Sequence, residues 1–118
     1  MAKQYKTFRE FWVDNHTATD GADGFPRYAS ARRVTCVDGF TVSIQASSRH
    51  YCSPREYLET GNYSSWELGY PSESDDLIAE YAEDKDALTN TVYGYVPNEI
   101  VESLLQGHGG ISIEGEAA

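Results

Sequence analysis

The chain has 118 residues, a net charge of −10, 40% hydrophobic content and 13% aromatic content, most of it from nine tyrosines. This length predicts a single domain over residues 1–118, and the aromatic content argues against a long disordered chain. There is no run of about 18 apolar residues, so we expect no transmembrane helix. Residues 1–6 lack the apolar core of a signal peptide, which predicts a cytoplasmic protein, in its own cell or in a host.

The N-terminal third predicts a helix and a long loop. Thr7 and Glu10 fit a capping box, in which each side chain satisfies a free backbone N–H of a helix start. The apolar residues that follow are spaced i, i+3 and i+4, which predicts an amphipathic helix over residues 8–15 with a core-facing stripe of Phe8, Phe11 and Trp12. Residues 16–31 show no period, and we interpret them as a loop whose length makes it a candidate functional segment.

Residues 33–46 predict a β-hairpin. The pair Asp38-Gly39 is typical of a two-residue type I′ turn, which needs positive φ at both central positions. After it, apolar and polar residues alternate, which indicates a half-buried strand with one wet face. Its buried positions are Phe40, Val42, Ile44 and Ala46.

The remaining elements are shorter. Ser53-Pro54-Arg55-Glu56 fits a second capping box and predicts one or two helical turns. We expect a strand over residues 64–70 with Trp66, Leu68 and Tyr70 on one face, a short acidic helix or turn over 72–84, and a strand over 89–96. Pro97 then opens a helix with a buried stripe, Gly107 is its C-cap, and the tail 111–118 pairs at a sheet edge or frays. The stripe consists of Ile100, Val101, Leu104 and Leu105.

This order of elements predicts an α+β fold. We expect a mainly antiparallel sheet of about four strands, covered on one face by the N-terminal and C-terminal helices.

One heptapeptide, residues 49–55, gathers a thiol, an imidazole and two cations. Nearby cations and a helix start would lower the pKa of the Cys52 thiol. A small enzyme or ligand-binding domain that uses Cys52 and His50 is therefore an alternative hypothesis. However, no third orienting residue or oxyanion loop is evident, and a capped turn explains the same residues.

Other chemistry has weaker support in the sequence. The three histidines are scattered singly, so we expect no zinc or other metal site, and we expect no cofactor. The glycines of residues 106–110 follow a helix, whereas phosphate-binding loops precede one. Cys36 and Cys52 form no C-x-x-C pair, which favours free thiols over a disulfide or a reactive thiol. The many tyrosines fit core packing, with a protein-binding face as the alternative.

Charge is distributed unevenly along the chain. Residues 1–55 contain eight Lys and Arg against five Asp and Glu, whereas residues 56–118 contain fourteen Asp and Glu against Lys85 alone. Eight carboxylates fall within residues 67–86, where the spacing does not fit a calcium loop. This run is either a solvated face or a surface that presents negative charge to a basic partner. The candidate partner-binding residues are Glu67, Glu73, Asp75, Asp76, Glu80, Glu83, Asp84 and Asp86.

Residues 50–55, 92–97 and 108–110 together resemble a group of small phage and mobile-element proteins. The resemblance covers about residues 33–110. Small acidic proteins of such elements are often anti-CRISPR or anti-restriction factors, some of which mimic DNA. The basic N-terminal half departs from an all-over acidic mimic and is compatible with a two-sided binder or a head-to-tail self-association.

The primary hypothesis is therefore a non-enzymatic inhibitor. It would bind a protein partner whose basic surface also binds nucleic acid, without contacting nucleic acid or membrane itself. A structural or housekeeping protein of a mobile element is a third possibility. The sequence leaves the oligomeric state open.

Overall fold

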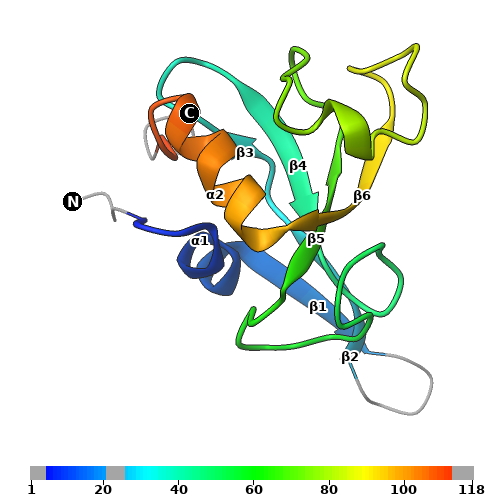
Figure 1. The fold of residues 1–118 in the computed structure, drawn as a ribbon. Helices are drawn as coiled ribbons and strands as arrows, with labels where there is room; N and C mark the ends of the chain where they lie inside the picture. Colours follow the sequence, from blue (N-terminus) through cyan, green and yellow to red (C-terminus); the bar gives the residue numbers. More distant parts are fainter. Residues whose placement is uncertain (1–4, 21–25, 113–118) are drawn as a thin grey trace.

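The computed structural model describes residues 5–20 and 26–112. Within them the α+β class is confirmed, with two helices, six strands and a one-turn 3₁₀ helix at Ala79–Tyr81 (Figure 1). The helices are α1 (Phe8–Asn15) and α2 (Asn98–Gly107), and the strands are β1 (His16–Asp20), β2 (Pro26–Ala31), β3 (Val34–Thr35), β4 (Thr41–Gln45), β5 (Ser65–Gly69) and β6 (Val92–Pro97).

The predicted antiparallel sheet is formed by four strands in the order β3-β4-β5-β6. β4 alternates between buried and half-exposed positions, as the hydrophobic pattern predicts, whereas β5 is buried at four of its five positions. Three cross-strand pairs place apolar side chains opposite each other on the buried face, and none of the six is exposed: Val34 with Val42, Ile44 with Leu68, and Trp66 with Val96.

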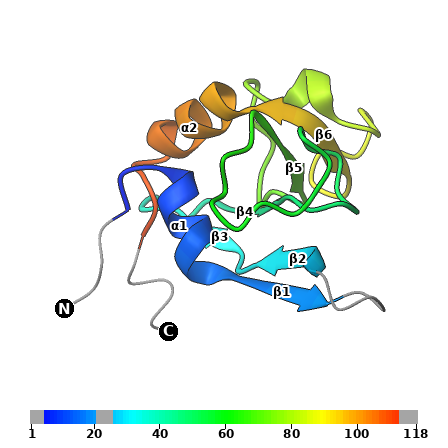
Figure 2. The ribbon, with the colours of Figure 1, turned by 90° about the horizontal axis from the view of Figure 1, so that it is seen from below.

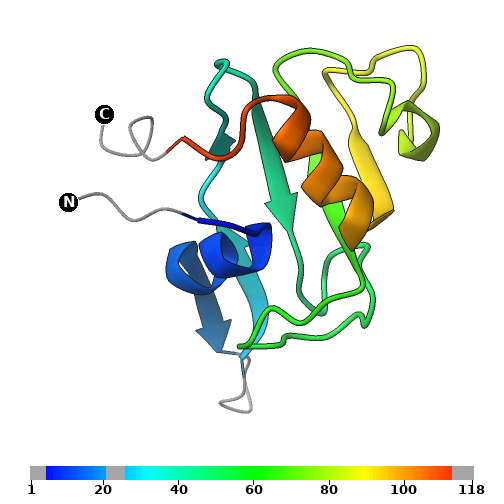
Figure 3. The ribbon, with the colours of Figure 1, turned by 60° about the vertical axis from the view of Figure 1, so that its left-hand side comes forward.

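Both helices lie on the same side of this sheet (Figure 3). The ring of Phe8 on α1 meets Trp66 edge-on at a centroid distance of 4.8 Å, a geometry that aromatic rings favour. From α2, Val101, Leu104 and Leu105 are buried, while Ile100 is only partly buried. The core therefore lies between the sheet and the two helices, as predicted.

The prediction that residues 16–31 form a loop is wrong. β1 and β2 form a two-stranded antiparallel sheet beside the main one (Figure 2). The pairing is completed by a tertiary contact: the Gln45 side chain on β4 accepts the Ala31 N–H at 2.7 Å and donates to the Ala31 carbonyl at 3.0 Å. Residues 21–25 of the predicted loop lie outside the described residues.

The β3–β4 hairpin is confirmed, but its turn is not type I′. Gly39 has a φ of +96°, and its N–H donates to the Cys36 carbonyl at 3.0 Å. Val37 and Asp38 are therefore the central turn residues, and the positive φ falls one position later. The Asp38 carboxylate accepts the Phe40 N–H at 2.9 Å, which stabilises this longer connection.

Two details of the middle segment are also corrected. Ser53 starts no helix, because its backbone pairs with β5: the Ser64 N–H donates to the Ser53 carbonyl at 2.8 Å. Tyr70 does not share the buried face of Trp66 and Leu68. It lies beyond the end of β5 with a φ of +50° and is 49% exposed.

The end of α2 also differs from the prediction. Gly107 is the last helical residue, and His108 is the C-cap. The left-handed backbone conformation falls at Gly109 and Gly110, and the Gly110 N–H donates to the Leu105 carbonyl at 2.8 Å. The tail then pairs at the sheet edge, where Ser112 N–H donates to the Thr35 carbonyl at 2.7 Å. Residues 113–118 lie outside the described residues.

Within residues 5–20 and 26–112, no helix is long and apolar enough to cross a membrane.

Candidate partner-binding surface

Most of the predicted acidic residues lie on one connection. We call residues 70–91, which join β5 to β6, the acidic loop; it is drawn in green to yellow in Figure 1. Six of its carboxylate side chains are exposed to solvent. These are Glu73, Asp76, Glu80, Glu83, Asp84 and Asp86.

The other two predicted acidic residues have internal partners. Glu67 lies on β5, partly buried, and its carboxylate accepts the Tyr51 N–H at 2.9 Å. Asp75 bonds through one carboxylate oxygen to Nε2 of His108 at 2.9 Å and through the other to the Leu77 N–H, also at 2.9 Å. The structure thus separates these two from the exposed group.

The acidic loop is attached to the fold along its length. At its start, the Ser72 N–H donates to the Thr41 carbonyl at 2.8 Å, and the Ser72 hydroxyl accepts the Thr41 N–H at 2.9 Å. Near its middle, Ile78 is fully buried in the core. Near its end, Glu83 N–H donates to the Val92 carbonyl at 2.9 Å. These contacts fix the loop backbone at Ser72, Ile78 and Glu83.

One lysine opposes these carboxylates within the acidic loop. The Lys85 ammonium donates to the backbone carbonyl of Glu80 at 2.9 Å. This hydrogen bond turns the cation towards the backbone of the loop. The same loop also exposes large apolar side chains, Leu77 at 41% and Tyr70 at 49%. Exposed apolar and aromatic groups beside charges are features of protein interfaces.

Cys52 and His50, the basis of the enzyme hypothesis, lie close together but are both buried. Nδ1 of His50 is 2.7 Å from the hydroxyl of Ser47, and the Cys52 thiol donates to the Ser47 carbonyl at 3.3 Å. Burial raises the pKa of the Cys52 thiol and lowers the pKa of His50. An activated thiol needs a lowered pKa and access to solvent, so this arrangement favours a structural role.

We expect Cys52 to react slowly with alkylating reagents. In a Cys36→Ser background, which isolates Cys52, the alkylation rate at pH 7.5 should be at least about tenfold lower in the folded protein than in urea, because the thiolate is the reacting species. Mass spectrometry after timed quenching measures both rates. If Cys52 in the folded protein were alkylated as fast as a free cysteine, the prediction would be wrong and Cys52 would again be a candidate nucleophile.

The tyrosines differ in burial in a way that the sequence pattern does not distinguish. Tyr63 and Tyr93 are buried in the core, whereas Tyr51 and Tyr95 are 42% and 49% exposed, with ring centroids 6.0 Å apart. The guanidinium of Arg55 lies 5.2 Å from the centre of the Tyr51 ring. This exposed pair has no sequence signature, because its two members come from distant segments.

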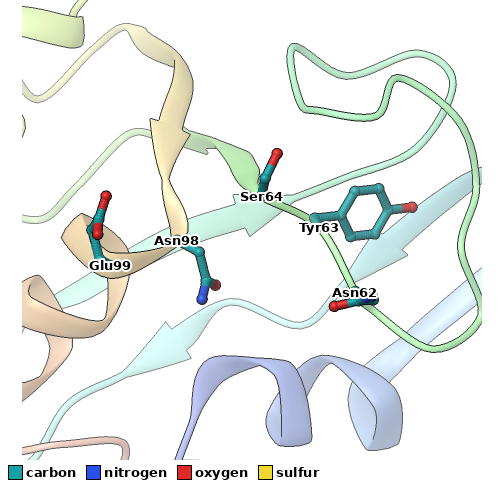
Figure 4. Close-up of a pocket in the computed structure, with 5 residues that line it drawn as sticks. All are labelled: Asn62, Tyr63, Ser64, Asn98 and Glu99. Carbon is teal, nitrogen blue, oxygen red and sulfur yellow. The ribbon is translucent and has the colours of Figure 1, made fainter.

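Figure 4 shows an open pocket of about 470 Å³ between residues 62–64 and the first turn of α2. Tyr63 points away from Asn98 in this view, and its hydroxyl is bonded to the backbone of Glu56 and Leu58. The side-chain amide oxygen of Asn98 accepts the indole N–H of Trp66 at 3.0 Å. The lining residues carry two amides, two hydroxyls and one carboxylate, and they include neither a cysteine nor a histidine.

In the described part of the chain, no group of three or more His, Cys, Asp or Glu residues could hold a metal ion. Comparison with protein-family models, with curated proteins and with solved structures found no match. The resemblance to phage and mobile-element proteins therefore stays a prediction.

Proposed function

We propose that the protein is a non-enzymatic inhibitor that binds a basic, nucleic-acid-binding surface of another protein through its acidic loop. The observation that carries this proposal is the set of six exposed carboxylates on a loop whose single lysine is turned to the backbone. A group of fixed negative charges resembles the phosphates that such a surface normally binds.

The attachment of the loop supports a binding role over a purely solubilising one. A solvated face needs negative charge but no defined geometry. Here buried Ile78 and the Ser72–Thr41 hydrogen bonds fix the backbone that bears the charges. A loop whose backbone is ordered before binding loses less conformational entropy on association. This favours a specific interface.

The proposed partner class is a host nucleic-acid-binding defence complex, such as an RNA-guided or restriction nuclease, met in the cytoplasm. This choice follows from the charge complementarity and from the resemblance to small mobile-element proteins. The proposal assigns no catalytic residue, metal or cofactor to the chain.

The test uses two probes, an arginine-rich decapeptide and a panel of purified RNA-guided and restriction nucleases with labelled DNA targets. We expect the protein to bind the decapeptide, with association slowing as salt rises, because exposed charges are screened beyond about 8 Å at physiological ionic strength. We also expect it to release labelled DNA from at least one nuclease. Binding to neither probe, or binding without salt dependence, would contradict the proposal.

A further inference from the structure

His108, at the C-cap of α2, lies between two carboxylates from different parts of the chain. Its Nδ1 is 2.6 Å from a carboxylate oxygen of Asp38, in the β3–β4 turn, and its Nε2 is 2.9 Å from one of Asp75, in the acidic loop. The imidazole stacks on the Phe40 ring, with the two ring centroids 3.9 Å apart and an angle of 7° between the ring planes. The His108 side chain is 11% exposed.

This geometry requires a charged imidazole. An ionised carboxylate only accepts hydrogen bonds, and a neutral imidazole has one N–H to donate. Both contacts of His108 are hydrogen bonds only when both ring nitrogens carry protons. Loss of one proton removes an ion pair from each side and leaves a nitrogen lone pair facing a carboxylate oxygen.

The two contacts of His108 differ in what else supports them. The β3–β4 turn is also joined to the end of α2 by backbone bonds that do not titrate: the N–H groups of Asp38 and Val37 donate to the carbonyls of His108 and Gly110. The stretch of the acidic loop over residues 73–77 is exposed at every position except Asp75. Deprotonation should therefore release this stretch while the turn stays in place.

We propose that His108 is a pH-dependent latch that holds residues 73–77 of the acidic loop against the β3–β4 turn. The latch itself is inferred from the contacts of His108 with Asp38 and Asp75. Its consequence for binding rests on the proposed function: residues 73–77 carry two of the six exposed carboxylates, Glu73 and Asp76, so the state of the latch regulates the presentation of these two to a basic partner.

The charged groups around His108 set the pH range. Burial lowers the pKa of His108, but the hydrogen bonds that its ring donates to Asp38 and Asp75 outweigh this effect and raise the pKa above the ordinary 6.5. A raised pKa means that the latch is closed below pH 6.5 and opens as the pH rises through the pKa of folded His108. Asp38 stays ionised throughout, since hydrogen bonds from Phe40 and His108 lower its pKa.

One further titratable group lies beside Asp38 in the same turn. Burial, with the nearby Asp38 charge, raises the pKa of the Cys36 thiol to about 11. Cys36 therefore stays neutral over the range in which His108 titrates, and the pH response belongs to the imidazole.

The latch is tested by an NMR titration of the full chain between pH 5 and 9, which follows the His108 ring and the amides of residues 73–77. In wild-type protein the amide shifts should follow the His108 titration. Asp75→Asn, which keeps the side-chain shape, should lower the pKa of His108 by about one unit or more, because it removes an adjacent opposite charge. Asp76→Asn is the matched control with the same change in charge, and Asp76 is exposed.

Two NMR results would overturn the latch: loop amides that do not follow the His108 titration, or equal lowering of the His108 pKa by Asp75→Asn and Asp76→Asn. His108→Gln gives a further check, since it should abolish the pH response of the amides of residues 73–77. Persistence of that response in a folded His108→Gln protein would also count against the latch.

The binding consequence is measured with the arginine-rich decapeptide at pH 6 and pH 9. Wild-type protein should bind about fivefold more tightly at pH 6, the low end of ordinary coupling between sites, and His108→Gln should lose this difference. Equal pH dependence in both proteins would overturn the regulation of binding. Absence of binding at either pH would instead count against the proposed function, and the NMR titration would still decide the latch.

Discussion

Reversal of four exposed acidic residues of the acidic loop to lysine is expected to slow association with the arginine-rich decapeptide by about tenfold or more at low salt. Fields from clustered charge raise association rates by about 10 to 1,000-fold, and rim charges act mostly on the association rate. The substitutions are Asp76→Lys, Glu80→Lys, Glu83→Lys and Asp86→Lys. Asp75 is left intact, because its carboxylate bonds His108.

The matched control reverses four exposed acidic residues on other segments: Asp14, Glu56, Glu59 and Glu99. Both sets change the net charge by the same amount, so a specific surface predicts a much larger effect for the loop set. Stopped-flow fluorescence with a labelled decapeptide measures the association rates. Both proteins should stay folded, since surface substitutions usually change stability by about 0.5 kcal/mol or less each. Equal slowing in both variants would show that the acidic loop acts only through non-specific attraction by net charge.

Truncation of Ile44 to alanine is expected to destabilise the fold by about 2–5 kcal/mol, as deletion of buried methyl groups does in a close-packed core. Ile44 is fully buried and pairs with Leu68 across β4 and β5. The loss is a large fraction of the stability of about 5–15 kcal/mol that an ordinary domain has.

Urea unfolding followed by tryptophan fluorescence gives the free energy of unfolding of each variant. Val13→Ala, at a side chain that is 46% exposed on α1, is the control, and it should change that free energy by about 0.5 kcal/mol or less. A loss below about 0.5 kcal/mol for Ile44→Ala would contradict the packing of β4 against the helices.

Local patterns explain which elements were predicted correctly. The alternation through Val42 and Ile44 and the i, i+3, i+4 spacing of α1 each depend on neighbours within a few residues, so the sequence contains the whole signal. Thr7 caps α1 as predicted, with its hydroxyl accepting the Glu10 N–H. The second half of the capping box forms differently, because the Glu10 carboxylate accepts the N–H of Lys6.

Two segments whose conformation involves partners distant in the chain were predicted incorrectly. β2 docks on the Gln45 side chain of β4, and no pattern within residues 16–31 encodes that contact. Ser53 has the residues of a helix start around it, but pairing with Ser64 and Ser65 holds it extended. Local propensity is a weak prior that tertiary pairing overrides.

The candidate surface shows the same division between local and tertiary information. Composition alone determined that the C-terminal half is acidic and that residues 67–86 concentrate the charge, since charge is a property of each residue type. Only the tertiary structure decided which carboxylates are free to meet a partner. Glu67 and Asp75 are engaged by Tyr51 and His108, residues 16 and 33 positions away, and the partners that a fold brings together from such distances leave no period in the sequence.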